Sequence, residues 1–440
     1  MKKKYVTSFA CTVVLGTLVA GCGTTQTGGS GNSTSQTSQT SQTSQSADLT
    51  LAWWTSTLRT QETLKAISMF EKANPSIKVT PDYTSWDTIW TKLTTQIAGG
   101  QTPDVIQMDE SQIVEYAQNK TIADLNKAGV DLSGLDKASL SLGEVNGVLY
   151  GVPTGVNAFA LLYDPAVLKQ IGVSVNPSQS MSWDSFAKLL VQIHKADPKI
   201  YGSEDGIEYE PVLEYYARDN GEQMFSSDDK SLGISQQVLT NWFTYWKNLE
   251  ENGGVVPPSY TSADNTSDMT ENPLVKGMSV FGWAWSNQLA AFEQTANKNL
   301  SMMMLPDYNS SSKPYFLHPS MYWSLSSTTK NPQAAVKLLN YLENDPQVSR
   351  TIKLDRGVPI NEANKQALEN DGSATDKAQI DFMNQVEKVA SPDAVYPPAA
   401  NQIQTLLTTA AQEVMLNKMT PSAAAQQFIT QANQALQQSN

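Results

Sequence analysis

Short apolar runs alternate with amphipathic segments at the start of the part of the chain that has a globular composition. Leu49–Trp54 has the pattern of a strand, and Thr60–Lys72 places Leu64, Ile67 and Phe70 on one face of a helix. Further strands and helices are predicted, in alternation, at Ile77–Val79, after Ser85, at Asp104–Met108 and at Ser111–Asn119. Such alternation is typical of βαβ units, so we predict an α/β fold with a largely parallel sheet.

Helical patterns dominate the later part of the chain. Helices are predicted at Gln236–Glu251 and Asn401–Leu416, with strands at Leu300–Leu305 and Tyr322–Leu325 between them. The body from Asp48 onward has about 390 residues, which is enough for two domains.

The N-terminal segment has the features of a secretion signal. Lys2–Lys4 precede an apolar stretch, Phe9–Ala20, that is too short to span a bilayer as a mature helix. Leu18–Cys22 resembles a bacterial lipobox, so we predict a signal peptide over residues 1–21 and acylation of Cys22. Cys11 would be removed with the signal, which leaves no thiol for a disulfide, a metal ion or a catalytic nucleophile.

A linker is predicted between the lipidated cysteine and the globular body, over residues 22–47. Thr24–Ala47 contains only small and polar residues and includes four tandem Thr-Ser-Gln units. Such a segment cannot bury apolar surface, so we expect it to be disordered. At roughly 5–6 Å × √n, it would reach about 25–30 Å from a membrane surface.

The charge of the chain limits its partners. Without the signal peptide it has 27 basic and 43 acidic residues, a net charge of −16. This balance argues against nucleic acid and against an anionic membrane surface as binding partners.

The segment Val280–Asn287 has a composition suited to a sugar site. Its apolar run breaks at Gly282, and Trp283 and Trp285 follow at alternate positions before Ser286 and Asn287. Indole rings offer flat apolar faces with one N–H donor, and these suit the C–H faces of a sugar ring. Both rings are equally compatible with a position in the core.

Several segments together carry a family resemblance. They are Phe70–Val79, Ala98–Ile106, Tyr150–Pro153 with Leu162–Asp164, Trp283–Asn287, Asn331–Ala335 and Arg356–Pro359. In this order behind a lipobox, they resemble the carbohydrate-binding, maltose-binding-protein-like family of bacterial extracellular solute-binding proteins. The resemblance extends over the whole body.

The resemblance implies a two-lobed periplasmic-binding-protein-like fold of type II, with two discontinuous domains joined by three hinge strands. Lobe 1 would contain residues 48–156 and 313–359, and lobe 2 residues 157–312 and 360–440. The hinges are expected near 155–158, 312–316 and 358–361. A ligand that contacts both lobes favours the closed state, which the permease of an ABC transporter would recognise.

The resemblance also suggests ligand-binding residues. Trp283 is expected to stack on the sugar, with Trp285 packing the wall behind it. Trp54 is expected at the cleft and Trp53 in the core, and either Tyr322 or Trp323 would face the ligand. The other candidates are Tyr83, Trp86, Asn157, Arg356, Arg59 and Asp109, with Glu110 as a weaker alternative to Asp109. A free Arg59 guanidinium could bind a carboxylate bidentately, which would point to a uronate-containing glycan.

These features predict a binding protein on the outer face of the cell membrane, held by its lipid anchor. We expect an oligosaccharide ligand, ABC permease subunits as partners, a monomer, and no catalytic residue, cofactor or metal. Maltose specificity is doubtful because Tyr396–Asn401 has only Tyr396 where the family has its last stacking tryptophan.

Two alternatives remain open. Two carboxylates facing each other across a cleft could serve a secreted glycan-processing enzyme, although no Gly-x-Ser-x-Gly, His-Glu-x-x-His or phosphate-binding glycine motif occurs in the body. A solute-binding protein for a non-sugar ligand is the other alternative.

Overall fold

The computed structural model describes residues 46–177, 181–226, 228–261, 269–307, 312–391 and 396–439. The predicted signal peptide, Cys22 and nearly all of the predicted linker lie outside these residues, although Ala47, predicted as linker, already begins a strand. Among the described residues, we find no helix with the length and apolar character needed to cross a membrane.

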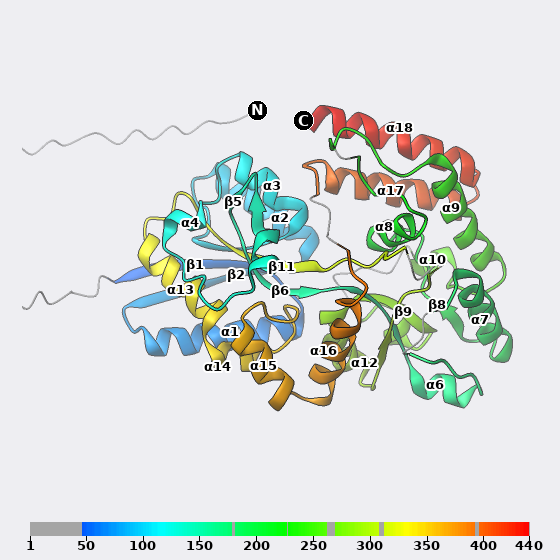
Figure 1. The fold of residues 1–440 in the computed structure, drawn as a ribbon, viewed down its shortest axis with the longest axis horizontal. Helices are drawn as coiled ribbons and strands as arrows, with labels where there is room; N and C mark the ends of the chain where they lie inside the picture. Colours follow the sequence, from blue (N-terminus) through cyan, green and yellow to red (C-terminus); the bar gives the residue numbers. More distant parts are fainter. Residues whose placement is uncertain are drawn as a thin grey trace, which may run out of the picture. The chain divides into compact units, whose positions relative to one another are not determined.

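Two separate sheets organise the described body (Figure 1). The first has five strands in the order β2 (Ile77–Thr84), β1 (Ala47–Trp54), β3 (Val105–Met108), β11 (His318–Leu325) and β6 (Val152–Asn157). The second has four strands in the order β10 (Ser301–Met303), β7 (Phe159–Tyr163), β9 (Ser279–Trp285) and β8 (Tyr201–Ser203). We call the elements around the first sheet lobe 1 and those around the second sheet lobe 2.

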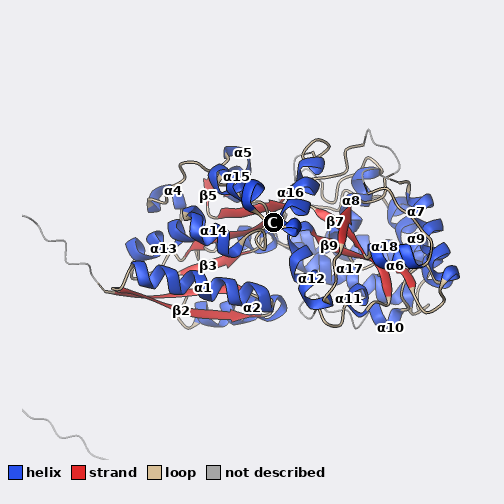
Figure 2. Cartoon of the chain, turned by 90° about the horizontal axis from the view of Figure 1, so that it is seen from below, coloured by secondary structure: helices blue, strands red, loops and turns tan. Residues whose placement is uncertain are grey.

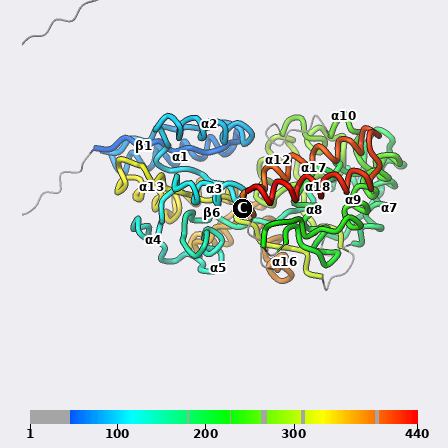
Figure 3. Tube along the Cα trace, turned by 90° about the horizontal axis from the view of Figure 1, so that it is seen from above, coloured from blue at the N-terminus to red at the C-terminus, as the bar shows by residue number. Residues whose placement is uncertain are grey.

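Helices surround each sheet (Figure 2). Lobe 1 contains α1 (Thr57–Ala73), α2 (Trp86–Ala98), α3 (Glu110–Gln118), α4 (Leu125–Ala128), α5 (Lys137–Leu140), η1 (Ser141–Gly143), α13 (Pro332–Asn344), α14 (Pro346–Ile352), α15 (Glu362–Asp371) and the hairpin β4 (Glu144–Val145) and β5 (Val148–Leu149). Lobe 2 contains α6 (Pro165–Gln170), α7 (Trp183–Ala196), α8 (Glu210–Asp219), α9 (Gln236–Glu251), α10 (Pro258–Thr261), α11 (Pro273–Lys276), η2 (Ser286–Gln288), α12 (Leu289–Ala296), α16 (Ala374–Val386), α17 (Ala400–Met415) and α18 (Pro421–Ser439). The C-terminal helix α18 packs along α9 and α17 (Figure 3).

The α/β class is confirmed, but the prediction of a largely parallel sheet is wrong. Strands β1, β2 and β3 pair in parallel, as the alternating pattern indicated. Strand β11 then pairs antiparallel with both β3 and β6. In lobe 2, β7 pairs antiparallel with β9 and β10, and only β8 and β9 are parallel. Strand β11 returns to the first sheet from lobe 2, so no βαβ crossover sets its direction.

The chain passes between the sheets at positions close to those predicted. Strand β6 ends at Asn157 in the first sheet, and β7 begins at Phe159 in the second. The chain returns between β10 and β11. Asn361, at the end of the predicted third hinge, and Asn364, beyond it, still hydrogen-bond to α13 of lobe 1. These contacts favour a third passage after α15, and the residue boundaries of the lobes stay a prediction.

Close backbone packing joins the connecting segments. Gly357 has φ +83°, and a Cβ atom there would lie 2.8 Å from the Val156 carbonyl oxygen. The Ser320 hydroxyl lies within hydrogen-bond distance of the backbone oxygens of Gly155 and Arg356. Because only glycine fits this approach, the three segments meet in one defined arrangement beside the site.

Candidate functional site

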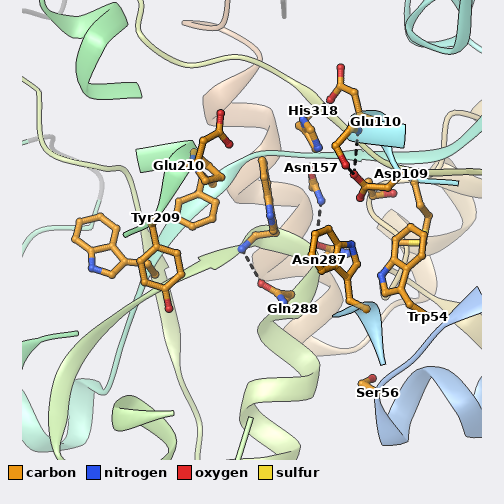
Figure 4. Close-up of a pocket in the computed structure, with 18 of the residues that line it drawn as sticks. Trp54, Ser56, Asp109, Glu110, Asn157, Tyr209, Glu210, Asn287, Gln288 and His318 are labelled. Carbon is orange, nitrogen blue, oxygen red and sulfur yellow. Dashed lines mark hydrogen bonds and ion pairs between the residues drawn. The ribbon is translucent and has the colours of Figure 1, made fainter. Parts of the chain in front are cut away.

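A cavity of about 300 Å³ lies between the ends of the two sheets, with residues of both lobes in its walls. Its lining includes eight aromatic side chains, together with carboxylates, amides and hydroxyls. Figure 4 shows Tyr209 and Glu210 on one side, Trp54 and Ser56 on the other, and Asn157 with Asn287 between them. Ligand sites in proteins commonly combine such apolar walls with a few convergent polar groups.

Trp283, which was predicted to stack on the sugar, is more deeply buried than Trp285, which was predicted to pack behind it. Trp283 is 2% exposed, packs edge-on against Phe186 and Trp246, and donates its indole N–H to the Glu204 carbonyl oxygen. It borders the cavity but offers little surface to a ligand. Trp285 is the less buried of the two and also lines the cavity. Trp285 is therefore the better stacking candidate.

Trp54, Trp86, Asp109 and Asn157 all line the cavity. Trp86 is half-buried at the start of α2, whereas Trp54 is nearly buried against Trp90. Asp109 caps α3 by accepting from the Ser111 N–H, so part of its hydrogen-bonding capacity is already used. Trp53 lies in the core of lobe 1, as predicted.

Arg59 lines the cavity, and one edge of its guanidinium is already occupied within the protein. Its Nε lies 2.6 Å from Asp355 Oδ2, and its Nη2 donates to the Asp355 carbonyl oxygen at 3.0 Å. The side chains of both residues are almost fully buried. The carboxyl group of Glu62, which burial and Asp355 hold at a pKa of about 8, lies in the same charged cluster. The predicted bidentate contact with a uronate would therefore have to compete with Asp355 for this guanidinium.

Three other predicted residues lie outside the cavity. Tyr83 is 41% exposed and packs against Trp53. Tyr322 is fully buried and donates its hydroxyl to the Leu142 carbonyl oxygen. Arg356 is buried over the Trp323 ring and donates to Gln107 and Thr63.

The prediction that Tyr322 or Trp323 faces the ligand is therefore wrong, because both side chains are fully buried on β11 and neither lines the cavity. Arg356 packs in the core of lobe 1. Burial and the neighbouring Arg59 lower its pKa to about 10.

The sequence analysis gave no role to His318, which lies at the centre of the site. Its ring stacks on Trp285 with centroids 4.4 Å apart and planes 20° apart. Its Nδ1 lies 2.7 Å from Glu110 Oε2, so the weaker alternative Glu110 also belongs to the site. His318 begins β11 and pairs with Asn157 at the end of β6. The predicted strand, Tyr322–Leu325, began four residues too late to include His318, so no local pattern placed it at the site.

Polar contacts also connect the lobes beneath the cavity. Asn157 Nδ2 donates to Asn287 Oδ1 at 3.0 Å, and Asn287 Nδ2 donates to the Asp355 carbonyl oxygen at 2.7 Å. Asn157 is 2% exposed, and its Oδ1 accepts no hydrogen bond from the described residues. A buried acceptor beside a cavity favours a ligand that donates a hydrogen bond, such as a hydroxyl group.

The far wall in lobe 2 adds further groups that the sequence analysis did not assign. Tyr396 is 7% exposed, borders the cavity and donates its hydroxyl to Glu214 at 2.7 Å. Tyr209 and Glu210, at the start of α8, line the same wall. In the part of the chain that the structure describes, no group of three or more His, Cys, Asp or Glu side chains is arranged to hold a metal ion.

Comparisons with a family model and with solved structures both find similarity to extracellular solute-binding proteins. A family model described as bacterial extracellular solute-binding protein matches residues 65–384. A solved extracellular solute-binding protein of family 1 from Alicyclobacillus acidocaldarius is 30% identical, and the match covers 89% of this chain and 99% of that one, with a TM-score of 0.66.

Two further relatives have named ligands. A periplasmic oligogalacturonide-binding protein from Yersinia enterocolitica, solved with saturated digalacturonic acid, is 24% identical over 89% of this chain and 99% of that one, with a TM-score of 0.80. The arabinooligosaccharide-binding protein of Bacillus subtilis is 25% identical over 213 residues, which are 46% of this chain and 45% of that protein.

Proposed function

Because the chain belongs to the bacterial extracellular solute-binding proteins, we propose that it captures an oligosaccharide and delivers it to an ABC permease for import. The observation that carries the proposal is the cavity between the lobes, whose aromatic rings and buried Asn157 acceptor suit the faces and hydroxyls of sugar rings. The oligosaccharide ligands of the Yersinia and Bacillus relatives support the same ligand class.

Closure of the two lobes on the ligand supplies the mechanism. Trp54 and Trp86 belong to lobe 1, whereas Trp285 and Tyr209 belong to lobe 2, so a sugar held between them would contact both lobes. Such a ligand stabilises the closed arrangement by the difference between its affinities for the closed and open states. The permease would then recognise the closed form.

The ligand class is tested by thermal unfolding and calorimetry with a panel of neutral and acidic oligosaccharides. A ligand at about 100 times its Kd should stabilise the folded protein by about 2.7 kcal/mol. If no glycan in the panel stabilises the protein, the sugar assignment is refuted.

The stacking role is tested by substitution of Trp285. We expect Trp285→Ala to weaken the binding of the best oligosaccharide at least about tenfold, or about 1.4 kcal/mol, because it removes a large apolar face from the cavity. Tyr83→Ala is the matched control, since Tyr83 is an aromatic residue outside the cavity. Equal affinities of Trp285→Ala and the unsubstituted protein would contradict the role.

We also propose that the protein binds its ligand without transforming it. Each carboxylate at the cavity already has a structural contact: Asp109 caps α3, Asp355 pairs with Arg59, Glu110 contacts His318, and Tyr396 lies 3.4 Å from Glu210. Binding should therefore be saturable and should release no reducing ends from the bound glycan. Steady release of reducing ends would favour the alternative of a glycan-processing enzyme.

The proposal includes a lipid anchor on Cys22 and a monomeric protein on the outer face of the membrane. The lipobox-like Leu18–Cys22 and the Thr-Ser-Gln linker support this location. We expect Cys22→Ala to move the protein from the membrane fraction into the medium, while Cys11→Ala leaves it in the membrane. Membrane association of Cys22→Ala equal to that of the unsubstituted protein would refute the lipid anchor.

A further inference from the structure

The candidate site has an excess of negative charge. Four of its lining residues are carboxylates, namely Asp109, Glu110, Glu210 and Asp355. Arg59 is the single arginine among the described lining residues, and no lysine occurs among them. With every carboxylate ionised, the lining therefore has a formal net charge of −3 with a neutral His318, or −2 with a protonated one.

Both groups that can carry positive charge are already paired within the protein. Arg59 contacts Asp355 through its Nε and through its Nη2. His318 Nδ1 faces Glu110 Oε2, and one face of its ring is stacked on Trp285. A carboxylate on a ligand would have to compete with Asp355 or Glu110 for these partners, and it would leave a buried carboxylate without its contact.

Two of the helix N-termini at the cavity, which would otherwise attract an anion, carry carboxylates of the protein itself. The N-terminus of α3 is capped by Asp109 and has Glu110 in its first turn. Helix α8 begins at Glu210. At both helices the protein's own carboxylates occupy the N-terminal position where the helix dipole would stabilise an anionic ligand most strongly. Helix α1 has Arg59 in its first turn with Asp355 against it. Helix α17, whose first residues Ala400 and Asn401 line the cavity, has no carboxylate in its first turn.

From this arrangement we infer that the site selects oligosaccharides without carboxylate groups and discriminates against uronic acids. The inference rests on the proposed sugar-binding function and adds the charge class of the ligand. A neutral sugar can donate its hydroxyls to Asn157 Oδ1 and gains from the acceptor oxygens of the carboxylates that line the cavity. A uronate instead loses its hydration on closure of the lobes and meets like charges, which lowers its affinity.

The test is calorimetry with pairs of ligands that differ only in the oxidation or esterification of C6. Suitable pairs are malto-, cello- and galacto-oligosaccharides with their C6-oxidised forms, and di- and trigalacturonic acids with their methyl esters. We expect the tightest binder to be neutral and its acidic counterpart to bind at least about tenfold more weakly. An acidic member that binds as tightly as its neutral counterpart, or more tightly, would overturn the inference and leave the sugar-binding function supported. If no member of any pair binds, the proposed function fails and the inference fails with it.

A charge variant tests the cause of this selectivity. Glu210→Gln removes one carboxylate from the cavity and keeps the shape of the side chain. We expect it to reduce the ratio of neutral to acidic affinity by about three- to tenfold, because one repulsive charge is lost near the ligand. Glu251→Gln is the control, since Glu251 is exposed at the end of α9 and outside the cavity. An unchanged ratio in Glu210→Gln, or an equal change in Glu251→Gln, would contradict the inference.

Discussion

Replacing Arg59 by methionine is expected to lower the free energy of unfolding by about 3–5 kcal/mol. Arg59 and Asp355 form a short ion pair between side chains that are 10% and 5% exposed. Methionine fills much of the same volume but leaves the Asp355 carboxylate buried without its closest cation. Arg356 Nη1, at 3.9 Å, is too distant to replace the two contacts that Arg59 makes. The large loss comes from this uncompensated charge rather than from the net strength of the pair.

Urea unfolding of three variants separates these contributions. Arg350→Met removes an exposed arginine from α14 and should change stability by less than about 0.5 kcal/mol. The double variant Arg59→Met/Asp355→Leu should recover most of the stability, since it removes both charges together. A loss below about 1 kcal/mol in Arg59→Met, or no recovery in the double variant, would show that the pair does not anchor this region.

The Arg59–Asp355 pair, which stabilises lobe 1, also takes part in the hydrogen bonds at the site. The carbonyl oxygen of Asp355 accepts from Arg59 Nη2 and from Asn287 Nδ2, and Asn287 lies in lobe 2. The same asparagine accepts from Asn157 at the end of β6. Arg59, which was expected to recognise the ligand, therefore serves to position the contact between the lobes. The cavity then depends on its aromatic and hydroxyl-binding groups for recognition.

Local sequence patterns predicted much of the secondary structure. The bounds of α9 agree with the predicted Gln236–Glu251, and Ser85 lies at the N-cap position of α2 as expected. Trp53 is buried and Trp54 reaches the cavity, as their alternate directions on β1 indicated. These properties depend on periodicity and capping, which neighbouring residues determine. The direction of β11 depends on where the chain returns from lobe 2, and no local pattern contains that information.

The site was less predictable because its contacts connect distant residues. Trp283 and Trp285 lie two positions apart on β9 and so share one face of the strand, which makes them equivalent by periodicity. Trp283 is buried because Phe186 and Trp246, from α7 and α9, cover it. Arg59 is paired with a residue 296 positions away. The candidates Trp54, Asp109 and Asn157 line the cavity because the sheet topology brings the ends of β1, β3 and β6 together.

A buried acid in lobe 1 has consequences for the pH dependence of stability. Glu343 lies on α13, is 7% exposed, and has a pKa raised from 4.5 to about 8 by burial. The folded protein therefore holds this proton at pH values where the unfolded chain has released it. By linkage, the contribution of Glu343 to stability is greatest below pH 4.5 and is lost as the pH rises through about 8.

We expect Glu343→Gln to remove this pH dependence, because glutamine keeps the shape and stays neutral. At 1.36 kcal/mol for each pKa unit, the shift sets an upper limit of about 5 kcal/mol, and we expect the variant to be about 2–4 kcal/mol more stable than the unsubstituted protein at pH 8. At pH 4.5 the two proteins should differ by less than about 1 kcal/mol, since Glu343 is then protonated in the folded state. Urea unfolding across this range, with the exposed Glu369→Gln on α15 as control, measures the difference. An equal stability difference at both pH values would mean that the pKa of Glu343 is not raised in the folded protein. The carboxylate would then be ionised at pH 8 in the small cavity that it shares with Arg356.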